Sequence, residues 1–167
     1  MSAAVHIKTI LATLTWVPVI YTFTEHVYQP YFITGRSMTP AFNPGTSTMT
    51  NDITMVQKFG LKSPDSLHRG DVILFRSPLS PEKILTKRVI AVGGDTVACT
   101  HKYPKPTARV PRNHLWVEGD NEFHSIDSNN FGPISQGLVV GKVVNVIWPP
   151  SRMGADFSGG GRNALVE

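Results

Sequence analysis

A serine and a lysine separated by fifty positions are the residues of this chain best suited to covalent chemistry. Ser37 lies in residues 35–40, GRSMTP, and Lys87 lies in residues 85–90, LTKRVI. A serine hydroxyl is a poor nucleophile until a base removes its proton. A lysine can be that base only if its surroundings lower the pKa of its ammonium group toward neutrality. The pair could cleave acyl bonds if the fold buries Lys87 beside Ser37.

The segment around Lys87 predicts such burial. Residues 84–92 are rich in β-branched side chains and end at a Gly-Gly-Asp turn signal, which is typical of a strand. Because side chains alternate along a strand, Lys87 shares its face with Leu85, Val89 and Ala91 and is the only polar residue there. Lost hydration among apolar neighbours lowers the pKa of a lysine. The strand alone leaves open an edge lysine whose amine reaches water.

The segment around Ser37 has the composition of a constrained loop. Gly35 allows a close backbone approach or a positive φ, and Pro40 together with the Pro-Gly pair at 44–45 excludes a long helix. A serine in such a turn, with backbone N–H groups free to stabilise an oxyanion, suits acyl transfer. An ordinary serine in a Gly/Pro turn is the alternative.

Four ordered segments argue against both ordinary alternatives. They are residues 37–40 (SMTP), 69–72 (RGDV), 87–95 (KRVIAVGGD) and 119–133 (GDNEFHSIDSNNFGP). In order and spacing they resemble the type I signal peptidases, which are membrane-anchored Ser/Lys endopeptidases with a β-rich catalytic domain. Further segments make the mitochondrial members the most similar: residues 43–45 (NPG), 110–120 (VPRNHLWVEGD) and 147–150 (IWPP).

The resemblance implies a role for each matching residue. Ser37 would be the nucleophile and Lys87 the general base, which later protonates the leaving amine. Ser125 would bond to the lysine amine and orient it, Asp127 would be a structural acid, and Met38 would line the site beside the nucleophile. The family requires no cofactor and no metal.

The chain departs from the bacterial members in three places. A hydroxyl two residues before the nucleophile often helps to bind the oxyanion, but Gly35 has none. Asn129 stands where bacterial members usually carry an arginine that pairs with the preceding acid, so Asp127 must have another partner. Only about twenty-five residues separate Gly94 from Gly119, and we therefore expect the large second β domain to be missing.

Two rival sites receive less support from the sequence. His124, Ser125 and Asp127 could be imagined as a triad, but neighbouring strand residues point to opposite faces, which makes His124 a poor base for Ser125. The six histidines show no metal-ligand spacing, and Cys99 is the single cysteine, which excludes an internal disulfide.

The sequence predicts a mainly β protein in three parts. Residues 1–30 would hold one transmembrane helix at about 7–27, residues 31–152 an antiparallel β catalytic domain, and residues 153–167, with three consecutive glycines, a flexible tail. Strands are expected at 53–57, 71–76, 84–92, 96–101, 114–118 and 138–148. We expect the substrate to pair with an exposed edge formed near residues 33–35 and 52–55.

The N-terminal segment is a borderline membrane span. Residues 9–24 carry no charge, but sixteen helical residues reach only ~24 Å against a hydrocarbon core of ~30 Å. Apolar residues up to 33 extend the stretch. A cleaved signal peptide is the rival, yet no small-x-small cleavage site follows. The low charged fraction of 17% fits partial membrane residence.

Charge and resemblance together indicate the partners. Residues 58–112 carry an excess of Lys and Arg, whereas residues 113–141 carry acids and neither Lys nor Arg. Without interleaved aromatic residues, this basic region favours anionic inner-membrane lipid or a partner subunit over nucleic acid, and a merely solvated face remains open.

The resemblance also implies an activity and a location. It implies removal of sorting peptides from precursor proteins at the mitochondrial inner membrane, a single-pass anchor, a catalytic domain facing the intermembrane space, and a second, related catalytic subunit. A non-catalytic stabilising subunit and a self-cleaving Ser/Lys regulator are the alternatives.

Overall fold

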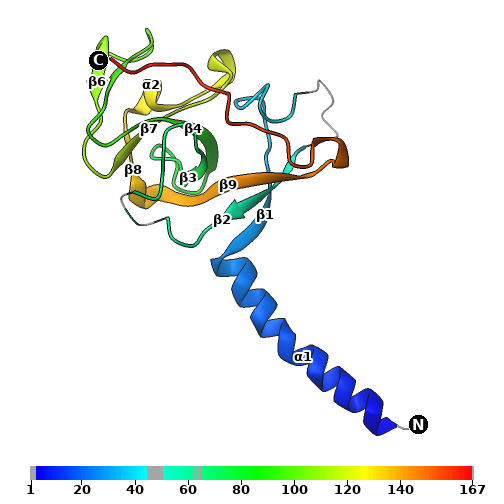
Figure 1. Cartoon of the computed structure of the whole chain (residues 1–167). Coiled ribbons are helices and arrows are strands. Elements are labelled where there is room, and N and C mark those ends of the chain that lie inside the picture. The colour runs from blue at the N-terminus through cyan, green and yellow to red at the C-terminus, as the bar shows by residue number, and fades with distance from the viewer. Residues whose placement is uncertain (1–2, 45–50, 62, 64, 167) are drawn as a thin grey trace.

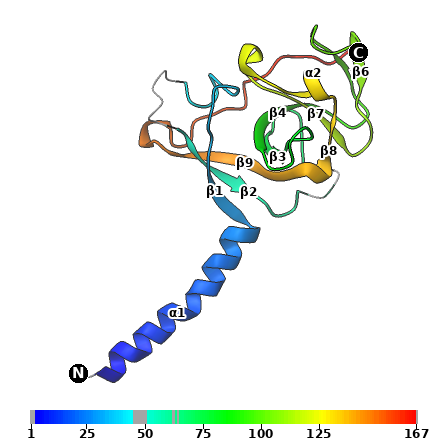
Figure 2. The same ribbon diagram turned by 180° about the vertical axis from the view of Figure 1, so that it is seen from behind.

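The computed structural model describes residues 3–44, 51–61, 63 and 65–166, and it consists of a helix attached to a β domain. Helix α1 (Ala3–His26) projects away from the domain in both views (Figure 1, Figure 2). Its described side chains begin at residue 12, and many are apolar and exposed: Leu14, Trp16, Val17, Val19, Ile20, Tyr21 and Phe23. At its base, Phe23 lies against Tyr28 with ring centroids 6.0 Å apart.

The transmembrane helix expected at 7–27 is not established by the structure. Within the described residues, none of the helices combines the length and the apolar character needed to cross a membrane.

In the described part of the chain, seven strands form one sheet in which every pair is antiparallel, as the sequence predicts. The spatial order is β1 (Tyr28–Phe32), β2 (Ile53–Gln57), β9 (Val139–Trp148), β3 (Val72–Arg76), β4 (Ile84–Val92), β7 (His114–Glu118) and β8 (Ile134–Ser135). Strands β5 (Thr96–Ala98) and β6 (Thr107–Arg109) form a separate pair between Gly94 and Gly119, where the bacterial second domain would be inserted. A short helix α2 (Ser128–Phe131) follows β7.

Strand prediction succeeded at most of the β-rich runs and missed the proline-containing β1 and the short strands β6 and β8. The bounds of β2, β4 and β7 are those expected. Strand β1 was not predicted because it follows the helix directly and contains Pro30. Proline is tolerated in edge strands, and β1 is an edge of the sheet.

The central strand β3 is buried on both faces. Val72 and Leu74 belong to one hydrophobic cluster, which also holds Met38 and Phe42. Ile73 and Phe75 belong to a second cluster on the opposite face. The segment of Met38 and Phe42, which packs on one face of β3, and strand β4, which contributes Val89 to the cluster on the other face, are therefore held in fixed positions relative to one another.

The C-terminal segment is packed and paired, in contrast to the flexible tail predicted from its glycines. It runs back over the domain from the end of β9 to the β5–β6 pair (Figure 1). The Val166 amide donates to the Thr96 carbonyl at 3.0 Å, and Ala98 donates to Ala164 at 2.7 Å. Earlier in the segment, Phe157 packs on Phe42 with centroids 5.1 Å apart. Main-chain pairing to β5, which sequence patterns do not reveal, holds this segment.

Candidate active site

Lys87 is buried in the middle of the sheet. Its strand β4 lies between β3 and β7, so Lys87 is not on an edge, and it is only 3% exposed. Ile73 is its partner on β3. Leu85 and Val89 share its face and pack in the second cluster, as predicted. Ala91 does not, because the pairing of β4 with β7 shifts between Val89 and Ala91.

Burial makes the ammonium group of Lys87 more acidic than that of an ordinary lysine. It lowers the pKa of Lys87 from 10.5 to about 8, even though the carboxylates of Asp127 and Asp120 act in the opposite direction. Among the described residues no ion pair includes Lys87, and Asp120 is instead bound by Arg88 at 2.7 Å. With this pKa, about a tenth of Lys87 is neutral at pH 7, which is enough to accept a proton.

The Ser37 backbone and the Ser125 side chain meet at Gly119, the residue directly after β7. Arg88 pairs with Glu118 across β4 and β7, so Lys87 and Gly119 each adjoin a member of this facing pair. A Cβ atom on Gly119 would overlap the Ser125 hydroxyl and come within 2.6 Å of the Ser37 carbonyl oxygen. Only glycine leaves room for the two serines at this position.

The loop that carries Ser37 is held by side chains rather than by regular structure. Gly35 has φ of 88°, a conformation that favours glycine, and Ser37 is half-buried. The side chain of Met38 is buried in the first cluster, so it supports the loop from the core. The Asn43 amide donates to the carbonyl of Ile33 at 2.8 Å and to that of Gly35 at 3.3 Å.

Asp52 and Arg152, which the sequence did not single out, complete this support. The carboxylate of Asp52 accepts from the backbone N–H of Asn43 at 3.0 Å. The backbone N–H of Asp52 donates to the side-chain oxygen Oδ1 of Asn43 at 2.7 Å. Arg152 Nε lies 3.1 Å from both Asp52 carboxylate oxygens, and its Nη2 donates to the Ala41 carbonyl at 2.7 Å. The partners are a hundred residues apart in sequence, so no local pattern could have revealed them.

The substrate edge expected at 52–55 is wrong. Strand β2, which begins at Ile53, is paired with β1 on one side and β9 on the other. The preceding Asp52 carbonyl accepts from the Ile33 N–H at 3.0 Å, which joins the two segments predicted to receive the peptide. The free edge at this end of the sheet belongs to β1.

Asp127 is fixed by hydrogen bonds in place of the missing arginine. Its Oδ2 accepts from Ser125 Oγ at 2.6 Å and from the Gly119 N–H at 3.2 Å. Its Oδ1 accepts from the backbone and side-chain nitrogens of Asn129 at 3.1 and 3.2 Å. Asp127 also caps helix α2 in a capping box with Asn130. Asp127 thus holds Ser125 in place, and its charge acts on Lys87.

Comparison with known proteins agrees with this geometry. Residues 6–105 and 100–148 match the family described as signal peptidase, peptidase S26. This chain belongs to the signal peptidase family. It is accordingly a serine endopeptidase of the signal peptidase type.

Curated relatives of this signal peptidase include mitochondrial inner membrane proteases. Mitochondrial inner membrane protease subunit 2 of Saccharomyces cerevisiae is 48% identical over 90% of this chain and 85% of its own length. The subunit 2 of Schizosaccharomyces pombe is 41% identical over 97% of this chain and 88% of its own length. Subunit 1 from the same organism is 30% identical over 78% of this chain and 80% of its own length.

The Ser-His-Asp alternative is not formed in this signal peptidase. The exposed His124 directs Nδ1 toward Asn121 Oδ1 at 3.4 Å. Ser125 donates directly to Asp127, with no imidazole between them. A histidine base for Ser125 would require the ring to occupy the position that the Asp127 carboxylate takes.

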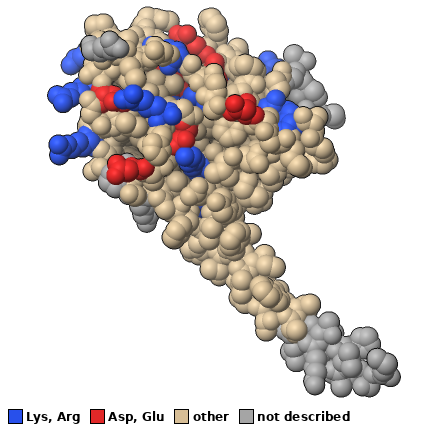
Figure 3. Space-filling model, viewed as in Figure 1, with Lys and Arg blue, Asp and Glu red and all other residues tan. Residues whose placement is uncertain are grey.

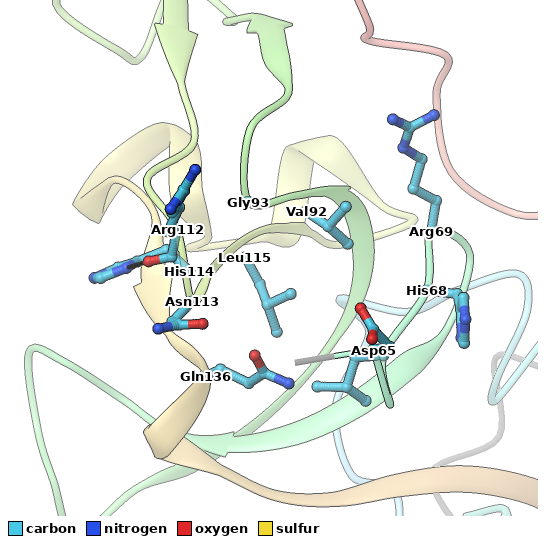
Figure 4. A pocket seen from close by; sticks show the side chains of 11 residues that line it. Asp65, His68, Arg69, Val92, Gly93, Arg112, Asn113, His114, Leu115 and Gln136 are labelled. Carbon is cyan, nitrogen blue, oxygen red and sulfur yellow. Dashed lines mark hydrogen bonds between the residues drawn. The ribbon is translucent and has the colours of Figure 1, made fainter. Parts of the chain in front are cut away.

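A pocket in the described part of the signal peptidase lies away from these residues. Its volume is about 620 Å³, and side chains of residues 65–69 face those of residues 112–115 across it (Figure 4). Arg69 on its rim is already held by Asp95 at 2.6 Å. None of the predicted site residues lines this pocket.

Proposed function

We propose that this signal peptidase removes hydrophobic sorting peptides from precursor proteins delivered to the mitochondrial intermembrane space, with Ser37 as nucleophile and Lys87 as general base. The observation that carries the proposal is the burial of Lys87, which gives it a pKa of about 8. Lys87 adjoins the Arg88–Glu118 pair, and the residue after Glu118 is Gly119, where the Ser37 carbonyl and the Ser125 hydroxyl meet. A serine hydroxyl beside a partly neutral buried amine is the arrangement that acyl transfer requires.

The reaction needs only groups of this chain and one water. Neutral Lys87 accepts the proton of Ser37 Oγ as the oxygen attacks the scissile carbonyl, and the tetrahedral intermediate collapses when the Lys87 ammonium protonates the leaving amine. Lys87 then takes a proton from water, which attacks the ester and releases Ser37 Oγ with its proton restored. Ser125, held by Asp127 at 2.6 Å, orients the amine in both halves.

The membrane location rests on the relatives and on α1. The relatives are named inner membrane proteases, and the described side chains of α1 expose a run of apolar residues to the surroundings. We infer that the N-terminal segment, to which the described apolar side chains of α1 contribute only a part, anchors the peptidase in a single pass and that the β domain lies on the intermembrane-space side. Protection of the β domain from external protease in intact mitochondria, lost when the outer membrane is ruptured, is the expected result.

The partners follow from the same features. Similarity to both subunit 1 and subunit 2 proteins supports assembly with a second, related catalytic subunit. Lys and Arg side chains gather on the side of the domain where β6 and β8 lie (Figure 3). This surface suits anionic inner-membrane lipid or an acidic face of the second subunit better than nucleic acid.

The decisive experiment replaces each member of the pair in an assembly whose other subunit has an inactivated serine. Ser37→Ala and Lys87→Met should each abolish cleavage of a detergent-solubilised precursor. Ser151→Ala and Lys83→Met, which alter exposed residues of the same types, should cleave normally. Unimpaired cleavage by Ser37→Ala would reject the proposed nucleophile. Inactivity of the unmodified chain in an intact assembly would instead identify it as a stabilising subunit.

A further inference from the structure

The C-terminal segment reaches the residue next to Gly119. Arg162 on this segment makes a two-pronged ion pair with Glu118, in which Nε donates to Oε2 and Nη2 donates to Oε1, both at 2.7 Å. Nη2 also donates to the Ala98 carbonyl at 2.6 Å. Glu118 is only 6% exposed, and its hydrogen bond to Arg162 raises the pKa of the arginine. A buried carboxylate of this kind depends on its cation.

Glu118 is joined to Asp127 through one amide group. Asn129 Nδ2 donates to Glu118 Oε1 at 2.9 Å and to Asp127 Oδ1 at 3.2 Å. Asn129 Oδ1 accepts from the Thr100 N–H at 2.9 Å, which fixes the orientation of the amide. Trp116 Nε1 supplies a further donor to Glu118 Oε1 at 2.8 Å. The four side chains from Arg162 to Asp127 therefore form one continuous hydrogen-bonded chain.

We propose that Arg162 is a positioning residue for the lysine base, acting through Glu118 and Asn129 on Asp127 and Ser125. This inference rests on the proposed function of Lys87. Asn129 bridges two carboxylates, whose mutual repulsion only a nearby cation can offset. Arg162 supplies that cation, so the far C-terminus of the chain takes part in shaping the catalytic site. A polar network of this kind is effective only while every member is satisfied.

The charged groups around Lys87 determine in which direction its pKa should change when the charge of Arg162 is removed. Asp127 and Asp120 face it from the segment after β7, and Asp120 is neutralised by Arg88. Across β3, Lys142 and Asp71 pair with each other at 2.8 Å. Removing the Arg162 charge leaves Glu118 uncompensated. The additional negative charge favours the protonated form of Lys87.

The test compares Arg162→Gln with Arg69→Gln in the full-length chain, within the assembly whose other subunit is inactivated. Arg69 forms a similar two-pronged pair with Asp95, at 3.0 and 2.6 Å, outside this network. For Arg162→Gln we expect kcat to fall about tenfold through misplacement of the base, and the low-pH limb of the kcat profile to move to higher pH. Arg69→Gln should leave both unchanged.

Further variants separate positioning from folding. Arg162→Lys retains the positive charge, so the low-pH limb of its kcat profile should lie close to that of the unmodified chain. Its kcat should still be reduced because lysine cannot form the two-pronged ion pair. The double variant Glu118→Gln/Arg162→Gln has no uncompensated carboxylate, so it should fold and show the original limb with lowered kcat. Unfolding temperatures are recorded for all variants.

The outcomes distinguish this inference from the proposed function. A lower unfolding temperature for Arg162→Gln with unchanged kcat and pH limb would show a merely structural role. If Arg162→Gln fails to fold, full kcat in the double variant overturns the inference. Both results leave the Ser/Lys mechanism standing, whereas cleavage by Lys87→Met would remove the mechanism and the role of Arg162 with it.

Discussion

Two buried carboxylates support the site, and each is held by an arginine from the C-terminal part of the chain. Asp52 is bound by Arg152 beside the loop of Ser37. Glu118 is bound by Arg162 and is joined through Asn129 to Asp127. Each carboxylate is also joined to an asparagine, Asn43 in the first case and Asn129 in the second.

The two clusters differ in what they hold. The Asp52 cluster bonds mainly to main-chain groups and so places the backbone of the loop that carries Ser37. The Glu118 cluster connects side chains and extends to Asp127, whose charge acts on Lys87. Disturbing the first should change the rate alone, whereas disturbing the second should change both the rate and its pH dependence.

The largest effect is expected where the two regions meet. Gly119→Ala would place a methyl group into the Ser125 hydroxyl and against the Ser37 carbonyl. Displacement of both serines should lower kcat about 100-fold or more, while the sheet stays folded. Cleavage assays and circular dichroism on the same preparation measure this. Gly137→Ala is the control, since its added Cβ would make only an ordinary contact of 3.5 Å. Near-normal cleavage by Gly119→Ala would refute the convergence of the two regions there.

A change at Asp127 should separate the effect of its charge, seen in the pH dependence of kcat, from the effect of its hydrogen bond to Ser125, seen in the size of kcat. Asp127→Asn removes a negative charge that raises the pKa of Lys87, so the low-pH limb should move to lower pH. This direction is opposite to that expected for Arg162→Gln. Loss of the charged acceptor for Ser125 should also reduce kcat, by roughly tenfold to 100-fold. An unmoved limb would mean that Asp127 does not act electrostatically on the base.

A change in the Asp52 cluster should lower kcat without moving the low-pH limb of the kcat profile. Arg152→Gln leaves the buried Asp52 without its cation and frees the Ala41 carbonyl. We expect kcat to fall about tenfold as the Ser37 loop loosens, with the low-pH limb unchanged. Steady-state kinetics at several pH values check both points. A limb that moves as far as in Arg162→Gln would erase the distinction between the two regions.

The last effect is one of stability and does not involve the reaction rate. The pKa of Lys87 is about 8 in the folded chain and 10.5 ordinarily, so the unfolded state binds more protons between these values and the stability of the wild type rises with pH across that window. Lys87→Met lacks this dependence. At pH 7 the variant should be more stable by about 3 kcal/mol, as measured by denaturant unfolding. Equal stability of the two chains at pH 7 would indicate a solvated lysine.

The sequence was sufficient for the parts of the site that are local. Alternation around Lys87 predicted its burial, and residues 119–133 contained Ser125 and Asp127 close together. Asn129 signalled only that Asp127 lacked its usual partner. Arg152 and Arg162 were missed because their pairs join residues 100 and 44 positions apart, and their contacts exist only after the C-terminal segment has docked on the sheet.

The central claim is that burial makes Lys87 a base near neutral pH, and titration of that one amine tests it most directly. Lysine side chains labelled with 13C at Cε can be followed by NMR against pH in the Ser37→Ala chain, with the Lys87→Met spectrum assigning the resonance. We predict a midpoint at about pH 8. A midpoint near the ordinary value of 10.5 would contradict the account, because Lys87 would then be almost wholly protonated at pH 7 and unable to activate Ser37.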